Sequence, residues 1–136
     1  MKKSALTLAA LTATSIFCAN TAYAKWDELG SNEIMVVYVD VDTIQVTGEN
    51  AQILSMLDFK KPGVNPSNKK QVSSIVGINE YNCPAITYRP IQYKEFSGPK
   101  GTGSVVSDNQ TPNSKFEPIV DKSWSAGVFK VVCKAK

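Results

Sequence analysis

The sequence predicts a small β-rich domain that is held together by one disulfide. Short runs of β-branched and aromatic residues alternate with turn segments rich in glycine, proline and asparagine, which is the pattern of an antiparallel sheet. Cys83 and Cys133 lie downstream of an N-terminal export signal, and an even pair of cysteines in an exported chain indicates a disulfide. With 136 residues, the chain has the length of a single domain.

The N-terminal segment over residues 1–24 has the three parts of an export signal. It begins with two lysines, continues with the apolar run Ala5–Phe17, and ends in the small-x-small cleavage site Ala22-Tyr23-Ala24. We therefore expect export through the Sec pathway and cleavage after Ala24, which leaves a single domain over residues 25–136.

Cys18 decides which kind of export signal this is. A lipoprotein signal has a small residue directly before the lipidated cysteine, whereas Phe17 stands there in this chain. Because Cys18 lacks a lipobox, we assign it to the discarded peptide rather than to a lipid anchor. This assignment favours a periplasmic or released protein over display at the cell surface.

Composition excludes several classes of function. Histidine is absent, which removes Ser-His-Asp catalysis and histidine metal sites, and two cysteines without histidine make a poor metal site. We expect no catalytic residue, no bound metal and no cofactor. Because Lys2 and Lys3 belong to the signal, the formal net charge falls from +3 to +1 on cleavage, too little to attract nucleic acid. No later run approaches the roughly 20 apolar residues of a transmembrane segment.

The strands follow from runs of β-branched and aromatic residues with alternating polarity. We expect them over Ile34–Val41, Ile44–Val46, Ala51–Lys60, Gln71–Cys83, Ile86–Phe96 and Ser104–Val106. Ala51–Lys60 also fits helical spacing, but the turn signals on both sides favour a strand. Pro90 lacks an amide donor, so its strand lies at a sheet edge or carries a bulge there. Trp26, in an otherwise polar start, is expected to pack on the sheet.

Polar segments between these runs predict the turns. We expect a turn at Asp40, Asp42 and Thr43, whose short side chains can bond nearby backbone amides, and a hairpin turn at Thr47–Asn50. Longer loops are expected over Lys61–Lys70, Ser97–Gly103 and Ser107–Ser114. Asp40 and Asp42 could alternatively act as a carboxylate pair or calcium ligands, although no further ligand or cleft is evident. The glycines of Gly98–Gly103 lack the context of a phosphate loop.

The C-terminal segment WSAGVFKVVCK is ambiguous on pattern alone. Its apolar residues recur at helical spacing, Ser123 or Asp121 can cap the start, and Lys130 and Lys134 suit the end. Its valines and Phe129 also have good strand propensity, and Gly127 costs about 1 kcal/mol in a helix. Helix is only slightly favoured.

Two groups of basic and aromatic residues are candidates for binding a partner. Lysine pairs bracket the predicted loop over residues 61–70, and basic and aromatic side chains interleave between residues 88 and 100. The candidate residues are Lys60, Lys61, Lys69, Lys70, Arg89, Tyr93, Lys94 and Lys100. The ordinary alternatives are a solvated loop that protects a sheet edge and tyrosines that belong to the core.

The order of motifs resembles one known family over nearly all of the predicted domain. An opening Trp26 precedes VVYVDVDTI, INEYNC, YRPIQYKEFSGPKGTG, KFEPI and the closing WSAGVFKVVCK. This order is similar to that of the surface-adhesin protein E-like family of Gram-negative bacteria. The chain departs from it at Ser55 and Met56, where many relatives carry tryptophan, at Phe116, which replaces another, and in its soluble-type export signal.

The resemblance implies a fold and a function. The fold is α+β, a curved antiparallel sheet of about six strands with a C-terminal α-helix packed on it and tied by the disulfide. The function is that of an exported, non-enzymatic protein that binds host matrix or plasma glycoproteins such as laminin and vitronectin, with homodimers formed through sheet surfaces. The alternative is a soluble periplasmic protein-binding factor, such as a hydrolase inhibitor or an envelope accessory.

Overall fold

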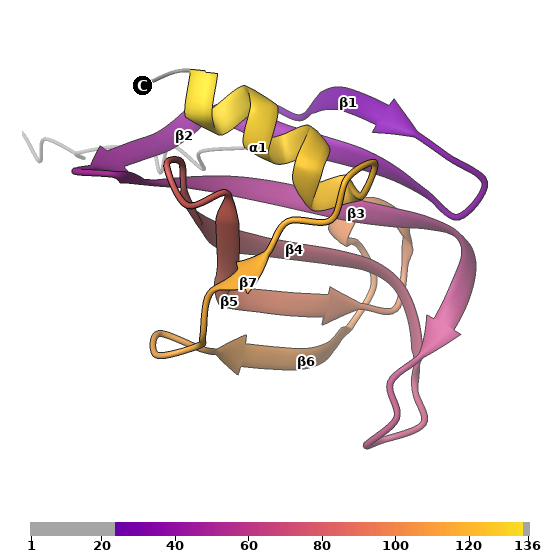
Figure 1. Cartoon of the computed structure of the whole chain (residues 1–136). Coiled ribbons are helices and arrows are strands. Elements are labelled where there is room, and N and C mark those ends of the chain that lie inside the picture. Colours follow the sequence, from indigo (N-terminus) through magenta and orange to yellow (C-terminus); the bar gives the residue numbers. More distant parts are fainter. Residues whose placement is uncertain (1–23, 135–136) are drawn as a thin grey trace, which may run out of the picture.

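The computed structural model describes residues 24–134, which form an antiparallel sheet with one α-helix packed against it (Figure 1). The predicted export signal up to residue 23, with Cys18, lies outside the described residues. The strands are β1 (Asp27–Ser31), β2 (Met35–Thr47), β3 (Asn50–Val64), β4 (Gln71–Asn82), β5 (Thr87–Phe96), β6 (Val105–Gln110) and β7 (Glu117–Pro118). A 3₁₀ turn, η1, spans Pro99–Gly101, and the helix α1 spans Trp124–Lys134. No helix within residues 24–134 has the length and apolarity to cross a membrane.

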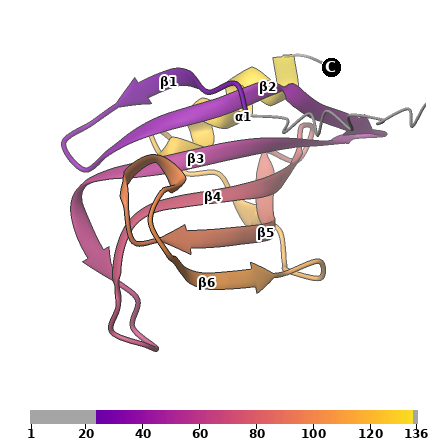
Figure 2. The ribbon, with the colours of Figure 1, turned by 180° about the vertical axis from the view of Figure 1, so that it is seen from behind.

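The sheet is an open meander in which each strand from β1 to β6 pairs antiparallel with the next strand along the chain. The two-residue β7 lies off this path and pairs with the start of β5. Helix α1 packs on one face, which we call the helix face, and Figure 2 shows the sheet from the opposite side, the far face. The fold predicted for the family is therefore confirmed, with a sheet of seven strands.

The core lies between α1 and the central strands. Its buried members come from β2, β3, β4 and α1: Val37, Val39, Ala51, Ile53, Tyr81, Val128 and Val132. The predicted disulfide is present between Cys83, just after β4, and Cys133 in the last turn of α1, with 5.6 Å between the Cα atoms. It fixes the end of the helix to the sheet that the helix covers.

The C-terminal segment is a helix because its valines have a core to enter. Val128 and Val132 stand four residues apart and are fully buried, as one face of a helix requires. Ser123 caps the start, since its Oγ accepts a hydrogen bond from the amide of Ala126 at 3.2 Å. Gly127 faces Leu29 of β1, and a Cβ at this position would lie 3.6 Å from Cδ2 of Leu29, an ordinary van der Waals distance.

The predicted turn at Asp40–Thr43 is wrong. Strand β2 runs through this point to Thr47, and the chain reverses at Gly48, which has a positive φ of 61°. The expected local bonds do form, from the amide of Asp42 to Oδ1 of Asp40 at 3.1 Å and from Oγ1 of Thr43 to the carbonyl of Asp40 at 2.6 Å. They produce a register shift between Asp40 and Gln45, so the strand is distorted and not ended.

The predicted loop over residues 61–70 is too long. β3 continues to Val64 and takes in Pro62 and Gly63, because a register shift between Asp58 and Gly63 removes the proline from the regular ladder. The turn itself is short and is closed by Asn65, whose Oδ1 accepts hydrogen bonds from the amides of Ser67 and Asn68.

Two polar strands differ from the sequence prediction. The predicted loop over residues 107–114 begins as β6, which reaches Gln110, and the predicted polar start contains β1. Both are the outer strands of the path, where backbone pairing on one side needs few apolar side chains. Trp26 is half-buried just before β1.

Pro90 lies at a bulge, as predicted. Ile78 of β4 pairs with Gln92 while Asn79 pairs with Pro90, so Ile91 is an extra residue in β5. β7 pairs with β5 before the bulge and β6 pairs with it after the bulge. The bulge therefore bends β5 between two partners, and the bend is visible in Figure 1.

Candidate functional site

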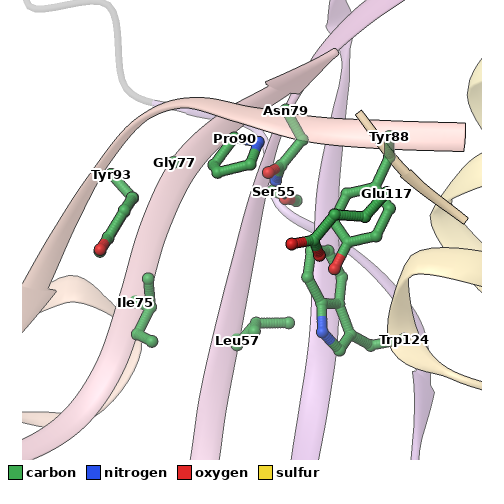
Figure 3. Close-up of a pocket in the computed structure, with 10 residues that line it drawn as sticks. All are labelled: Ser55, Leu57, Ile75, Gly77, Asn79, Tyr88, Pro90, Tyr93, Glu117 and Trp124. Atoms are coloured by element: carbon green, nitrogen blue, oxygen red, sulfur yellow. Dashed lines mark hydrogen bonds between the residues drawn. The ribbon is translucent and has the colours of Figure 1, made fainter. Parts of the chain in front are cut away.

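A cavity of about 240 Å³ opens on the helix face, beside the start of α1 (Figure 3). Strands β3 and β4 form its floor through Ser55, Leu57, Ile75, Gly77 and Asn79. The walls come from β5, β7 and α1 through Tyr88, Pro90, Tyr93, Glu117 and Trp124. An apolar hollow with a few polar groups is the usual form of a binding site in a small domain.

Gly77 makes the hollow possible. It sits between Ser55 and Tyr93 in the strand pairing, and a Cβ at this position would lie 2.6 Å from the carbonyl oxygen of Gln92 and 2.7 Å from Cβ of Tyr93. Because Gly77 has no side chain, β4 and β5 can approach closely at this point, and the space above Gly77 stays open as part of the cavity. The neighbouring floor residues Ser55 and Asn79 are buried, and the side-chain Nδ2 of Asn79 donates a weak hydrogen bond to Oγ of Ser55 at 3.4 Å.

Aromatic rings form the wall toward the helix. The ring of Tyr88 meets the indole of Trp124 edge to face, with 5.7 Å between centroids and an interplanar angle of 81°, a favourable arrangement for two aromatic groups. Behind it, Tyr88 stacks on the buried Tyr81 at 5.9 Å. This wall is fixed to the core and is shaped before any ligand arrives.

Glu117 supplies the charge of the site. It pairs with Tyr88 across β5 and β7 and is exposed at the rim. Burial and then the carboxylate of Glu117 raise the pKa of the Tyr88 phenol above its usual value. The phenol is neutral at physiological pH and can donate a hydrogen bond. The cavity thus combines aromatic faces with one negative charge.

The candidate residues from the sequence are not brought together. Lys60, Lys61, Lys69 and Lys70 are exposed along the β3–β4 hairpin, whose end projects away from the rest of the sheet in both views (Figures 1 and 2). Lys94 pairs with Asp108 at 3.8 Å, with both side chains about half exposed. Lys100 in η1 lies over the ring of Tyr38, 5.6 Å from its centroid.

Arg89 has a structural role. Its guanidinium bonds to Oε1 of Glu80 at 2.9 Å and donates to the carbonyl oxygens of Pro112 and Ser114. It also lies over the ring of Phe116 at 4.9 Å. These contacts hold the segment that leads from β6 to β7, and hence position Glu117.

Of the candidate residues, Tyr93 alone lines the cavity. The other residues that line the cavity could not be grouped from the sequence, because they come from five elements of the structure and only the fold brings them together. Gly77 was the sequence feature that could have pointed to this site, since a glycine inside a predicted strand often marks a close backbone approach.

The acidic side chains of residues 24–134 do not gather into a metal site. These residues contain no group of three or more histidine, cysteine, aspartate or glutamate side chains arranged to hold a metal. Asp40 is buried, whereas the side chain of Asp42 is 66 % exposed. Neither residue lines the cavity beside α1.

Known proteins place the chain in a family. The sequence model described as "Surface-adhesin protein E" matches residues 26–134. The fold is similar to a solved structure of Haemophilus influenzae protein E, with 14% identity and a TM-score of 0.58 over 81% of this chain and 84% of that one. It is also similar to protein E from non-typeable Haemophilus influenzae, with 14% identity and a TM-score of 0.53 over 85% of this chain and 79% of that one.

No curated protein sequence matches the chain. At 14% identity the solved structures support the fold alone, while the family match extends over most of the chain. The chain belongs to the surface-adhesin protein E family.

Proposed function

We propose that this protein is an exported, non-enzymatic binding module that holds a protein ligand in the cavity beside α1. The observation that carries the proposal is the preformed aromatic wall of Tyr88 and Trp124 next to the carboxylate of Glu117. Aromatic residues dominate binding energy at protein interfaces, and a cation over such rings gains about 0.5–2 kcal/mol. A lysine or arginine side chain of the ligand fits this combination best.

Membership in the family supports a host ligand. The resemblance noted from the sequence points to matrix and plasma glycoproteins such as laminin and vitronectin. It also supports pairing of two copies through sheet surfaces, which light scattering on the purified domain measures directly. The lysines of the β3–β4 hairpin, with Lys94 and Lys100, are proposed as outlying contacts that raise the rate of encounter with acidic regions of the same ligand.

The first test measures saturable binding of the domain over residues 25–136 to immobilised laminin and vitronectin. Glu117→Lys is expected to weaken binding at least tenfold, because it reverses the charge at the rim. Glu33→Lys makes the same change at an exposed site in the β1–β2 turn and is the matched control, with unchanged binding expected.

The outcomes separate the parts of the proposal. Absence of saturable binding to both glycoproteins refutes the adhesive function. Equal binding by wild type and the Glu117→Lys variant refutes the cavity as the site. A loss confined to a Lys69→Glu/Lys70→Glu variant assigns the contact to the hairpin instead.

A second candidate, a soluble periplasmic protein-binding factor, is favoured by the residue before Cys18. Phe17 is large where a lipoprotein signal requires a small residue, so the proposed exported form has no lipid anchor. Release of the protein by osmotic shock supports the periplasmic factor. Digestion by protease added to intact cells supports the surface adhesin.

A further inference from the structure

Asp40 is a buried carboxylate at the irregular point of β2. Asp40 is 5 % exposed, and both oxygens of its carboxylate accept hydrogen bonds from backbone amides. Oδ1 accepts from the amide of Asp42 and Oδ2 accepts from the amide of Lys25, each at 3.1 Å. The bond from Lys25 thereby joins the start of the described chain to the middle of β2.

Within residues 24–134, no lysine or arginine nitrogen lies within 4.0 Å of the Asp40 carboxylate. The ammonium of Lys25 is directed instead to the exposed Asp42, at 3.4 Å. A buried carboxylate without a positive partner is costly, because neutral amides replace only part of its lost hydration. The site therefore lacks a cation in the immediate surroundings of Asp40.

The backbone nitrogen of Lys25 is the atom that the predicted processing would release. Ala22-Tyr23-Ala24 is a small-x-small cleavage site directly before it. Hydrolysis of the Ala24–Lys25 bond by a signal peptidase adds one water: Ala24 keeps the carboxylate, and Lys25 gains a free amino group that is protonated at neutral pH.

We propose that cleavage after Ala24 turns the Lys25–Asp40 hydrogen bond into a partly buried ion pair that locks the new N-terminus onto β2. The α-ammonium keeps the donor direction of the amide and adds the missing charge, so the sheet needs no rearrangement. The inference rests on the proposed export signal and is independent of the binding cavity. Its function is to make the processed chain more stable than the precursor.

The test compares two purified chains that start at Lys25 and at Ala24. The longer chain retains a neutral amide at Lys25 and moves its ammonium one residue away. An ammonium donor adds an ionic attraction to a hydrogen bond that already ends on a carboxylate, and we expect the folding equilibrium constant of the Lys25 chain to be about tenfold larger in urea titrations. The difference should vanish when both chains carry Asp40→Asn.

Asp42→Asn is the matched control, since it removes the exposed partner of the Lys25 side chain and should leave the tenfold difference in place. Equal stability of the two starts in the wild-type background overturns the proposal, and this comparison needs no Asp40 variant to fold. A difference that persists with Asp40→Asn also overturns it. So does an exported protein whose mass shows a start other than Lys25.

Discussion

At the scale of single residues, Tyr81 shows what the fold accepts in order to pack. Its ring is fully buried between Tyr88 and Phe129, and within residues 24–134 its hydroxyl has no hydrogen-bond partner. Burial raises the pKa of this phenol well above its usual value, with a smaller contribution from Tyr88. The Tyr81 ring therefore gains aromatic packing, while its buried hydroxyl is left without a hydrogen bond.

Tyr81→Phe is expected to stabilise the protein by about 1 kcal/mol at pH 7, because it removes a buried hydroxyl without a partner. The raised pKa favours the neutral phenol in the folded state. The stabilisation that arises from this pKa difference is complete at pH values below about 10, the pKa of tyrosine in the unfolded chain. It is lost as the pH rises above that value. Urea unfolding at pH 7 and above pH 10 should thus show a smaller alkaline loss in the variant. A less stable variant at pH 7 would reveal a hidden partner for the hydroxyl.

Gly77→Ala is expected to destabilise by about 1–3 kcal/mol, as overpacking does. The new Cβ would meet the backbone of β5 at 2.6 Å, where no flexible side-chain end can move aside. Gly30→Ala on β1 is the matched control, since no atom lies within 4 Å of a Cβ there. Urea midpoints measure both variants, and similar midpoints would contradict the close approach at Gly77.

At the scale of elements, the structure was predictable where side-chain pattern dictates it and was not predictable where tertiary contacts dictate it. The strands around Ile53, Ile75 and Tyr88 were predictable because apolar alternation and turn residues agree. The polar strands β1 and β6 were missed or shortened, because pairing through the backbone leaves little trace in side-chain polarity. The pattern of the final segment was nearly balanced, and burial of Val128 and Val132 under the sheet makes it a helix.

The disulfide links the last of these elements to the sheet. Cys83 and Cys133 are 50 residues apart, and closing a loop of that length stabilises by about 4 kcal/mol in the chain-entropy model. The double variant Cys83→Ala/Cys133→Ala should lose about that much in urea unfolding. Reductant should destabilise the wild type and leave the double variant unchanged. Equal melting temperatures of the wild type with and without reductant would contradict the contribution.

At the scale of the whole molecule, strand alternation explains why the cavity could not be read from the chain. Arg89, Tyr93 and Lys94 are close in sequence, yet Tyr93 lines the cavity while Arg89 and Lys94 bond elsewhere. Ser55, Gly77 and Trp124 are far apart in sequence and meet at one point. A sequence shows neighbours along a strand, whereas the register between strands decides neighbours across a sheet.

The meander has a consequence for how the chain acquires its structure. Each strand from β1 to β6 pairs with its chain neighbour, so the sheet can grow from the N-terminus in the order of the chain, through contacts of short sequence separation. The helix that covers Val39 and Ile53 comes last, and the bridging cysteine is near its end. Until those final residues arrive, a finished sheet exposes its apolar face, which is the stage at which such a chain is most prone to aggregate.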